Sequence, residues 1–280
     1  MLRIKHKNIS MQFVTLAVLC MCFGLVISLL LTSTHAAQPP QQPYYVVDAY
    51  QTPGVVFRIV DREPGDSFRR RSGNISSIAF CNGELYFCSA NDRRIYQIIE
   101  ERERVVFEHK TYIRDIAVDP SGNFYFSAAS GAGSDGAIYE LRPRANELGS
   151  AQRFSISRRR PIQVYLKTVD GFWAGDFTFD AQGNLYLSTG NRTPAFIYKV
   201  PKEEGGRYGS PRKLYKDTEG YIKGIAIYPS NQNVIYYADW KQTIYKFDIM
   251  NSRRSREFSM NIAGSPKPHL SDVAFDIRIR

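Results

Sequence analysis

The clearest pattern in the chain is a repeated unit, in which a short apolar strand is followed by a Gly/Asn turn and a Tyr-rich strand. In one copy, apolar residues predominate from Ile113 to Val118, and the segment Asp119-Pro-Ser-Gly-Asn123 supplies the turn before Phe124. A unit that returns at intervals of roughly 40 to 60 residues is typical of circular or stacked arrays of small sheets. The five copies occupy residues 75–86, 113–125, 174–186, 222–236 and 270–276.

Two further strands follow in each repeat. The third strand contains an Ile-Tyr pair and is predicted at residues 94–98, 137–141, 196–200 and 243–247. A more polar fourth strand is predicted at residues 105–108, 163–167, 212–216 and 256–259. Four consecutive antiparallel strands per repeat, arranged about one axis, are the blades of an all-β β-propeller.

The two ends of the repeat array complement each other. Residues 45–48 resemble a second strand and residues 55–59 a third, but no first strand precedes them. The last segment, residues 272–276, is a first strand with nothing after it. Pairing this C-terminal strand with the N-terminal hairpin would close the ring and remove an unpaired inner edge. We therefore predict five blades, and a degenerate sixth blade between Ile116 and Phe177 is the alternative.

The N-terminal region differs in composition from the repeats. Basic residues between Arg3 and Lys7 precede an apolar run from Met11 to Leu31, and small residues follow it. Residues 1–37 are thus predicted to be a signal peptide or an uncleaved membrane anchor, because the run is long enough to span a bilayer. Residues 38–43 form a linker, and residues 44–280 form the propeller domain. Both alternatives place the propeller outside the cytoplasm, secreted or anchored.

Cysteine and histidine contribute little chemistry. A hairpin turn at Asn82-Gly83 would place Cys81 opposite Glu84 and Cys88 opposite Ser77. The two cysteine thiols would then be too far apart for a disulfide. We expect two buried free thiols. Beyond the leader only two histidines remain, so a zinc site is excluded, and no glycine-rich phosphate loop joins a strand to a helix.

One position at the start of the first strand is acidic in three repeats, and in a propeller these starts converge at one mouth of the central channel. Three neighbouring carboxylates repel one another unless a cation or a proton intervenes, and oxygen ligands suit Ca²⁺ or Mg²⁺. Arg114 and Lys223, beside this position, could neutralise the acids instead. Alternatively, each aspartate accepts hydrogen bonds from backbone N–H groups between blades. The equivalent residues are Ser77, Asp115, Asp176, Gly224 and Asp272.

The loops on the same face as these strand starts predict a binding surface. They are the connections from the second to the third strand and from one blade to the next. Aromatic residues beside Gly/Ser loops combine apolar area with adaptable hydrogen bonding, although Trp side chains can also pack between blades. The candidate ligand or partner residues are Phe172, Trp173, Trp240, Arg93, Asn191 and Arg192.

Arginines cluster elsewhere, in the outer strands or on the opposite face, at residues 69–71, at residues 158–160, and at 253, 254 and 256. The formal net charge of the chain is +10. The clusters are predicted to form a solvated edge that suppresses edge-to-edge pairing, or to contact an anionic surface such as phospholipid headgroups or an acidic polymer. An exported domain does not meet nucleic acid, so that partner is excluded.

Several phrases in the repeats resemble known propeller families. Residues 119–125 (Asp-Pro-Ser-Gly-Asn-Phe-Tyr), 180–186 and 197–200 resemble NHL-repeat and gluconolactonase (senescence-marker-like) propellers, and Tyr236-Tyr-Ala-Asp-Trp240 resembles a YWTD repeat. The resemblance covers most of residues 44–280. It implies a recognition module in the NHL and YWTD cases. In the gluconolactonase-like case it implies hydrolysis of lactones or esters around a calcium-type ion, yet the usual N-terminal glutamate has no match in residues 44–49.

Together these patterns predict an exported propeller that recognises a protein, a glycan or a small ligand on the channel-mouth face. The alternative is a lactone or ester hydrolase that depends on a divalent metal held by Asp115, Asp176 and Asp272. A structural component of the cell envelope is a third possibility. We expect a binding module rather than an enzyme, and the sequence identifies no catalytic residue.

Overall fold

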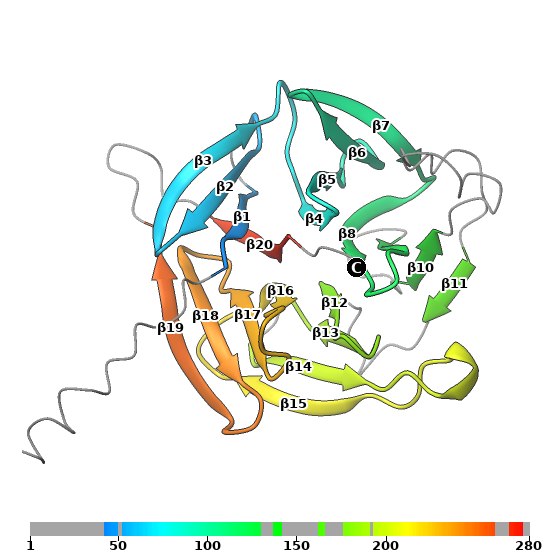
Figure 1. Ribbon diagram of the computed structural model, residues 1–280, viewed down its shortest axis with the longest axis vertical. Coiled ribbons are helices and arrows are strands. Elements are labelled where there is room, and N and C mark those ends of the chain that lie inside the picture. Colours follow the sequence, from blue (N-terminus) through cyan, green and yellow to red (C-terminus); the bar gives the residue numbers. More distant parts are fainter. Residues whose placement is uncertain are drawn as a thin grey trace, which may run out of the picture. The chain divides into compact units, whose positions relative to one another are not determined.

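The computed structural model describes residues 42–49, 52–129, 137–141, 162–165, 176–190, 193–260 and 269–276. These residues form five four-stranded antiparallel sheets around a common axis (Figure 1). The prediction of an all-β propeller with five blades is therefore confirmed. Within the described ranges, the structure contains no helix that is long and apolar enough to cross a membrane. The predicted leader, residues 1–37, lies outside them.

Each blade consists of four strands, which run in order from the strand nearest the axis to the outermost strand. The blade that contains both chain ends consists of β20 (Leu270–Phe275), β1 (Tyr44–Asp48), β2 (Val55–Val60) and β3 (Glu63–Arg69). The next two blades are β4 (Ser77–Cys81), β5 (Glu84–Ser89), β6 (Arg94–Ile99) and β7 (Arg102–Glu108), then β8 (Tyr112–Val118), β9 (Phe124–Ala129), β10 (Ala137–Leu141) and β11 (Ile162–Tyr165). The last two are β12 (Phe177–Phe179), β13 (Leu185–Ser188), β14 (Ala195–Val200) and β15 (Arg212–Asp217), then β16 (Lys223–Ile227), β17 (Val234–Ala238), β18 (Thr243–Asp248) and β19 (Arg253–Ser259).

The ring closes through the predicted pairing of the two ends. Strand β20 lies antiparallel to β1, and Val273 is directly opposite Val46 in the register. The side chain of Gln42 also donates a hydrogen bond of 3.0 Å to the backbone oxygen of Asp276. Because β20 pairs with β1, the inner edge of β1 has no free backbone groups, and the blade between the two ends is complete.

Neighbouring blades pack through small residues on one sheet and large residues on the next. Ala117 of β8 belongs to the same buried cluster as Phe177 and Phe179 of β12. Ala226 of β16 packs in the same way in a cluster that contains Val273 of β20. A small side chain next to a large one lets the innermost strands approach closely, which a ring of only five blades requires.

The turn between the first and second strands explains the repeated Asp-x-x-Gly-Asn phrase. Asp119 Oδ1 accepts hydrogen bonds from the backbone N–H groups of Ser121 and Asn123, both at 2.9 Å. Gly122 adopts φ +82°, a left-handed conformation that glycine takes without strain. Asp180 makes the equivalent bonds in a later repeat. The phrase therefore encodes a turn and not a catalytic site.

The cysteines lie as the hairpin turn predicts. Cys81 is opposite Glu84, and Cys88 is opposite Ser77. Both thiols are free and buried. Burial raises the pKa of Cys81 to about 11, so this thiol stays protonated and unreactive at neutral pH.

Two features of the outer strands differ from the prediction. Strand β3 was not predicted, because Pro64 and Gly65 within it disfavour strands in general. Arg70 was assigned to a solvated or anion-binding cluster, but it is buried at 5% exposure. Its guanidinium donates to Asp92 Oδ2 at 2.5 Å and to Glu103 Oε2 at 3.2 Å. That assignment is wrong for Arg70, whose charge is neutralised inside the protein.

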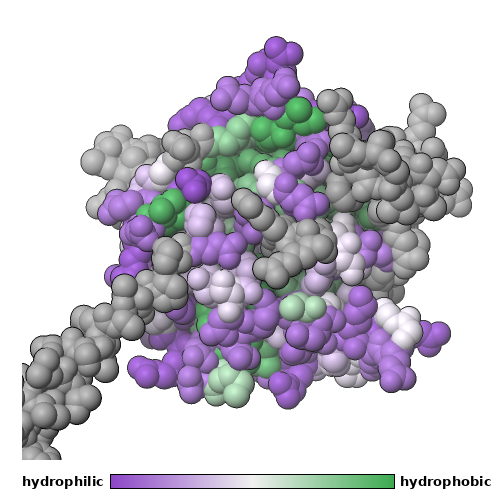
Figure 2. Space-filling model, in the orientation of Figure 1, coloured by the Kyte–Doolittle hydropathy of each residue, from purple (hydrophilic) through white to green (hydrophobic). Residues whose placement is uncertain are grey.

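The remaining described arginines of the clusters lie toward solvent. Arg69, Arg71, Arg253 and Arg256 are exposed, whereas residues 158–160 lie outside the described residues. Arg254 is partly exposed and donates to Asp217 at 2.9 Å and to Glu219 at 2.6 Å. On the face shown in Figure 2, hydrophilic residues predominate around the periphery. Among the described residues, the exposed large hydrophobic side chains are Val105 and Met250.

Candidate functional site

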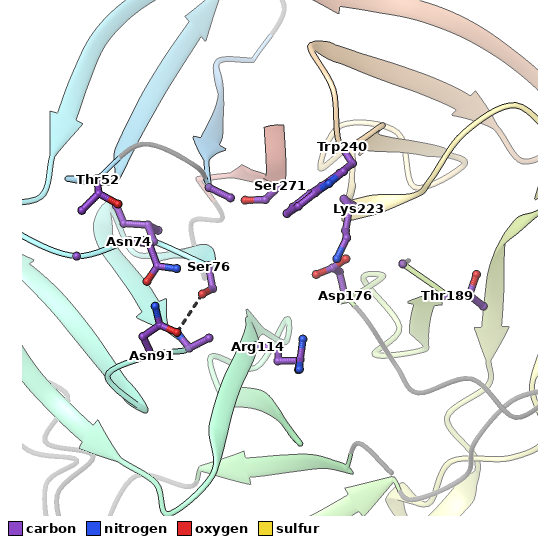
Figure 3. A pocket seen from close by; sticks show the side chains of 15 residues that line it. Thr52, Asn74, Ser76, Asn91, Arg114, Asp176, Thr189, Lys223, Trp240 and Ser271 are labelled. Atoms are coloured by element: carbon purple, nitrogen blue, oxygen red, sulfur yellow. Dashed lines mark hydrogen bonds between the residues drawn. The ribbon is translucent and has the colours of Figure 1, made fainter. Parts of the chain in front are cut away.

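The candidate site is a cavity of about 480 Å³ where the innermost strands begin (Figure 3). All five blades contribute to its wall, through the residue just before or at each strand start and through the connecting loops. The polar and aromatic lining residues are Thr52, Asn74, Ser76, Asn91, Arg114, Asp176, Thr189, Lys223, Trp240 and Ser271. This position at the strand starts agrees with the predicted binding face.

Beneath the cavity, the aligned acidic position links successive blades by hydrogen bonds. Asp272 Oδ2 accepts from the backbone N–H of Ile78 at 2.8 Å. This bond joins the closing blade, which contains both chain ends, to the next blade. Asp115 Oδ2 accepts from the N–H of Phe177 at 2.6 Å across another boundary. Ser77 occupies the same position, and its Oγ accepts from the N–H of Ile116 at 3.2 Å. These bonds support the interpretation that the aspartates accept backbone N–H groups between blades.

The fifth residue of this position is Gly224, which adopts φ +44°. A Cβ atom at Gly224 would collide with the backbone of Asp272. Glycine is therefore required where the last blade meets the closing blade, because any side chain would push the two innermost strands apart. The backbone N–H of Gly224 also hydrogen-bonds to Asp176.

Burial and mutual repulsion shift the protonation of the three carboxyl groups. Desolvation raises the pKa of Asp115 well above its usual range, and the charges of Asp272 and Asp176 raise it further. Desolvation likewise raises the pKa of Asp272 to about 8, with a smaller contribution from Asp176. The pKa of Asp176 is also raised by burial, against the opposing influence of Lys223 and Arg114. Protons thus relieve the repulsion that the sequence predicted.

The aligned acidic position offers few free ligand atoms for a metal ion among the described residues. Within the described part of the chain, no three His, Cys, Asp or Glu side chains form a group that could hold a metal. Both oxygens of Asp115 accept hydrogen bonds, from Ser77 Oγ at 2.5 Å and from Phe177, and both oxygens of Asp272 accept backbone N–H bonds. Calcium needs about six to eight oxygen ligands, and these carboxylates are already engaged. The metal-ligand role of Asp115, Asp176 and Asp272 stays a prediction.

The cavity wall carries two cationic side chains and one carboxylate. Arg114 and Lys223 point into the cavity from different blades, and Asp176 lies next to Lys223 (Figure 3). The Nζ atom of Lys223 lies 4.7 Å from the centre of the Trp240 ring, in a cation–π contact. His269 Nδ1 lies 3.1 Å from the Trp240 backbone oxygen, which helps to fix the loop.

Hydroxyl and amide groups complete the wall. Ser76 Oγ accepts from the backbone N–H of Ala90 at 2.9 Å, and Thr189 Oγ1 accepts from that of Phe196 at 2.9 Å. Ser271 is buried at 5% exposure, and its Oγ has no hydrogen-bond partner among the described residues. A buried hydroxyl without a partner is uncommon, so Ser271 is a candidate for a ligand contact.

The predicted face residues have mixed outcomes. Trp240 lines the cavity, whereas Arg93 does not, since it is exposed and its guanidinium lies 5.3 Å from the ring of Tyr112. Phe172, Trp173, Asn191 and Arg192 lie outside the described residues. The sequence prediction missed Ser76 and Ser271 as lining residues. The repeat alignment contained the signal, because both occupy the position of Arg114 and Lys223, one residue before the acidic position.

Comparisons with known proteins support the fold. No protein-family model and no curated protein match the chain. Among solved structures, a luciferin-regenerating enzyme is 13% identical, with 83% of this chain and 78% of that one covered and a TM-score of 0.50. A gluconolactonase from Xanthomonas campestris is 11% identical over 82% and 78%, with a TM-score of 0.51. A protein of unknown function from Bacteroides thetaiotaomicron is 11% identical over 86% and 66%, with a TM-score of 0.54.

At these identities the likeness is one of fold alone. The chain is a five-bladed β-propeller, similar in fold to a gluconolactonase and to a luciferin-regenerating enzyme. The predicted likeness to gluconolactonase-type propellers is confirmed at the level of architecture.

Proposed function

We propose that this chain is an exported binding module that takes a small polar ligand into the cavity at the channel mouth. The observation that carries the proposal is the composition of the wall, where Arg114, Asp176, Lys223 and Trp240 converge from three blades on one space of about 480 Å³. Sites for small molecules are concave, within roughly 300–1,000 Å³, and combine an apolar surface with a few convergent polar groups. The export component rests on the sequence of residues 1–37.

A binding role agrees with how the buried acids are used. Asp115 and Asp272 accept hydrogen bonds that hold neighbouring blades together, so they are engaged in the framework of the site. Asp176 is the carboxylate that reaches the cavity among the described residues, and two cations flank it. A pocket held by such a framework is preformed, which lowers the ordering cost of binding.

The test is a ligand screen on the full chain by thermal unfolding, with neutral sugars, sugar acids, amino acids and simple carboxylic acids as probes. We expect at least one probe to raise the unfolding temperature in wild type and to lose that effect in Lys223→Gln. The matched control Lys241→Gln changes an exposed lysine beside Trp240 that does not line the cavity. No stabilisation by any probe, or equal loss in both variants, would contradict a binding role for this cavity.

The alternative is a lactone or ester hydrolase that uses a divalent metal, and its support is the fold shared with a gluconolactonase. It requires a metal at Asp115, Asp176 and Asp272. Glucono-δ-lactone hydrolysis measured with added Ca²⁺ or Mg²⁺ and with chelator separates the two proposals. Turnover that requires the metal and is lost in Asp176→Asn would favour the hydrolase.

A further inference from the structure

We propose that the cavity binds a carbohydrate that carries a single carboxylate, with the acid group held by Arg114 and Lys223 and the hydroxyls held by the surrounding amide and hydroxyl side chains. This inference rests on the proposed binding function and names the class of ligand. It depends on the charged side chains of the wall, on the distribution of its polar groups and on one buried hydroxyl.

The charge balance favours an anion. Among the described residues that line the cavity, Arg114 and Lys223 are cationic side chains, and Asp176 is the one acidic side chain. The carboxyl groups of Asp115 and Asp272 do not line the cavity, because they are 2% and 3% exposed and accept hydrogen bonds between blades. In the described part of the wall, cationic side chains therefore outnumber acidic ones, and an anionic ligand would balance them in a partly desolvated space.

The neighbouring acid and the donor geometry favour a carboxylate. A phosphate monoester carries about two negative charges at neutral pH and would place one of them near the carboxyl group of Asp176. The guanidinium of Arg114 presents parallel N–H donors that suit the two oxygens of a carboxylate. Lys223 supplies a point charge, and its cation–π contact at 4.7 Å from the Trp240 ring helps to orient it.

The rest of the wall suits a polyhydroxylated body. Around the charged residues lie four amide or hydroxyl side chains on the closing blade and its neighbour, namely Thr52, Asn74, Ser76 and Asn91, and Thr189 lies across the cavity (Figure 3). Such groups donate to and accept from sugar hydroxyls. The half-buried indole of Trp240 offers a flat apolar surface for a sugar ring.

Ser271 provides the sharpest geometric sign. Its Oγ is buried in the wall and has no hydrogen-bond partner among the described residues, whereas the neighbouring N–H of Val273 donates to Asp272 Oδ1. A polar group left unpaired in this way costs free energy that a ligand hydroxyl would recover on binding. A ligand with hydroxyls several bonds from its acid group can reach both Ser271 and the cations, which acetate cannot do.

The experiment is isothermal titration calorimetry of the full chain at pH 7 and low salt. The probes are D-glucuronate and D-galacturonate, the neutral sugars D-glucose and D-galactose, acetate, and inorganic phosphate. We expect a uronate to bind at least about tenfold more tightly than its neutral parent sugar and than acetate or phosphate. Arg114→Gln and Lys223→Gln should each weaken uronate binding about tenfold or more.

Control variants separate a direct contact from a general effect. Arg93→Gln removes an exposed arginine on the same face that does not line the cavity, and Lys241→Gln does the same for a lysine, so both should keep wild-type affinity. Ser271→Ala should weaken uronate binding severalfold and leave any weak acetate binding unchanged. This pattern would place the hydroxyl contacts and the acid contact in the same cavity.

Different results would contradict the ligand class and the proposed binding function. Equal affinity for uronates and neutral sugars would overturn the inference and leave the proposed binding function in place. Acetate or phosphate binding as tightly as a uronate would also overturn it, because the cavity would then select charge without a sugar. Binding of an unrelated probe from the thermal screen, with no uronate binding, would likewise overturn the inference and leave the proposed binding function in place. No binding of any probe in either experiment would overturn the proposed function itself.

Discussion

Asp115 Oδ2 accepts a hydrogen bond of 2.6 Å from the backbone N–H of Phe177, across the boundary between two blades. The other oxygen of Asp115 accepts from Ser77 Oγ, which in turn accepts from the N–H of Ile116. One carboxyl group therefore connects three successive blades near the axis. This structural role accounts for Asp115, and the residues proposed to bind a ligand line the cavity.

Replacing Asp115 by asparagine should stabilise the protein at alkaline pH. An asparagine oxygen can accept from Phe177, and its NH₂ can donate to Ser77 Oγ, so the contact with Ser77 remains with its direction reversed and without the charge. The folded state holds the Asp115 proton more tightly than the unfolded state, so its contribution to stability is present at low pH and is lost as pH rises. We expect Asp115→Asn to gain on the order of 1 kcal/mol at pH 9 in urea denaturation.

The same comparison at lower pH gives the control. At pH 4 the advantage of Asp115→Asn should vanish, because the wild-type carboxyl is then protonated. Asp61→Asn, at an exposed turn residue, should not change the pH dependence. An Asp115→Asn variant that loses stability equally at every pH would show that the carboxyl charge is not repelled in the folded state.

The closing strand should contribute strongly to stability. Leu270 of β20 is fully buried in the cluster that joins the two chain ends. Leu270→Ala should lower the free energy of unfolding by about 2–5 kcal/mol, through lost burial and the cavity left behind. Val105→Ala, at a residue that is 46% exposed, should cost about 0.5 kcal/mol or less. Equal effects of the two substitutions in chemical denaturation would argue against closure through β20.

Gly224 should tolerate no side chain. Gly224→Ala brings a methyl group against the backbone of Asp272 and imposes a strained φ on a non-glycine residue. We expect a loss of about 3 kcal/mol or more, seen as a lower unfolding temperature or as insoluble protein. Gly220→Ala is the control, because no atom lies within 4 Å of the added Cβ, and it should fold with near wild-type stability. A Gly224→Ala variant as stable as wild type would show that the two strands can separate freely.

The buried Arg70 should matter more than its exposed neighbour. Arg70→Met leaves the carboxylates of Asp92 and Glu103 without their partner, and we expect a loss of about 3 kcal/mol. Arg71→Met changes an exposed side chain and should stay within about 0.5 kcal/mol of wild type. The free energies come from urea unfolding of both variants, and similar values would contradict the buried ion-pair assignment.

Much of the architecture follows from the sequence because the local alternation of apolar and polar residues predicts the strands. The pairing of Val46 with Val273 was predicted from two incomplete repeats. The N-terminal repeat lacks its first strand, and the C-terminal repeat consists of a first strand alone. The opposition of Cys81 to Glu84 follows from the two-residue turn between them. Both inferences need only the alternation of side chains along strands and the chemistry of turns.

The candidate cavity lies at the predicted channel mouth, but its detailed contacts were not predicted. The alignment of repeats brought Asp115, Asp176 and Asp272 to one level, and that pattern favoured backbone acceptors over a metal site without excluding the metal. Which oxygens accept which N–H groups depends on the offset between neighbouring blades, and no single repeat encodes it. Arg70 lay in a run of three arginines, and only the packing of β5 and β6 around it distinguishes it from the exposed two.

The central claim is that the channel-mouth cavity recognises a carbohydrate acid. Its most direct test is a crystal structure of the protein grown with D-glucuronate at neutral pH. The account predicts electron density for the sugar within the cavity, with its carboxylate in contact with Arg114 and Lys223 and a hydroxyl within hydrogen-bond distance of Ser271 Oγ. Density for the sugar at another surface, with the cavity free of it, would contradict the claim.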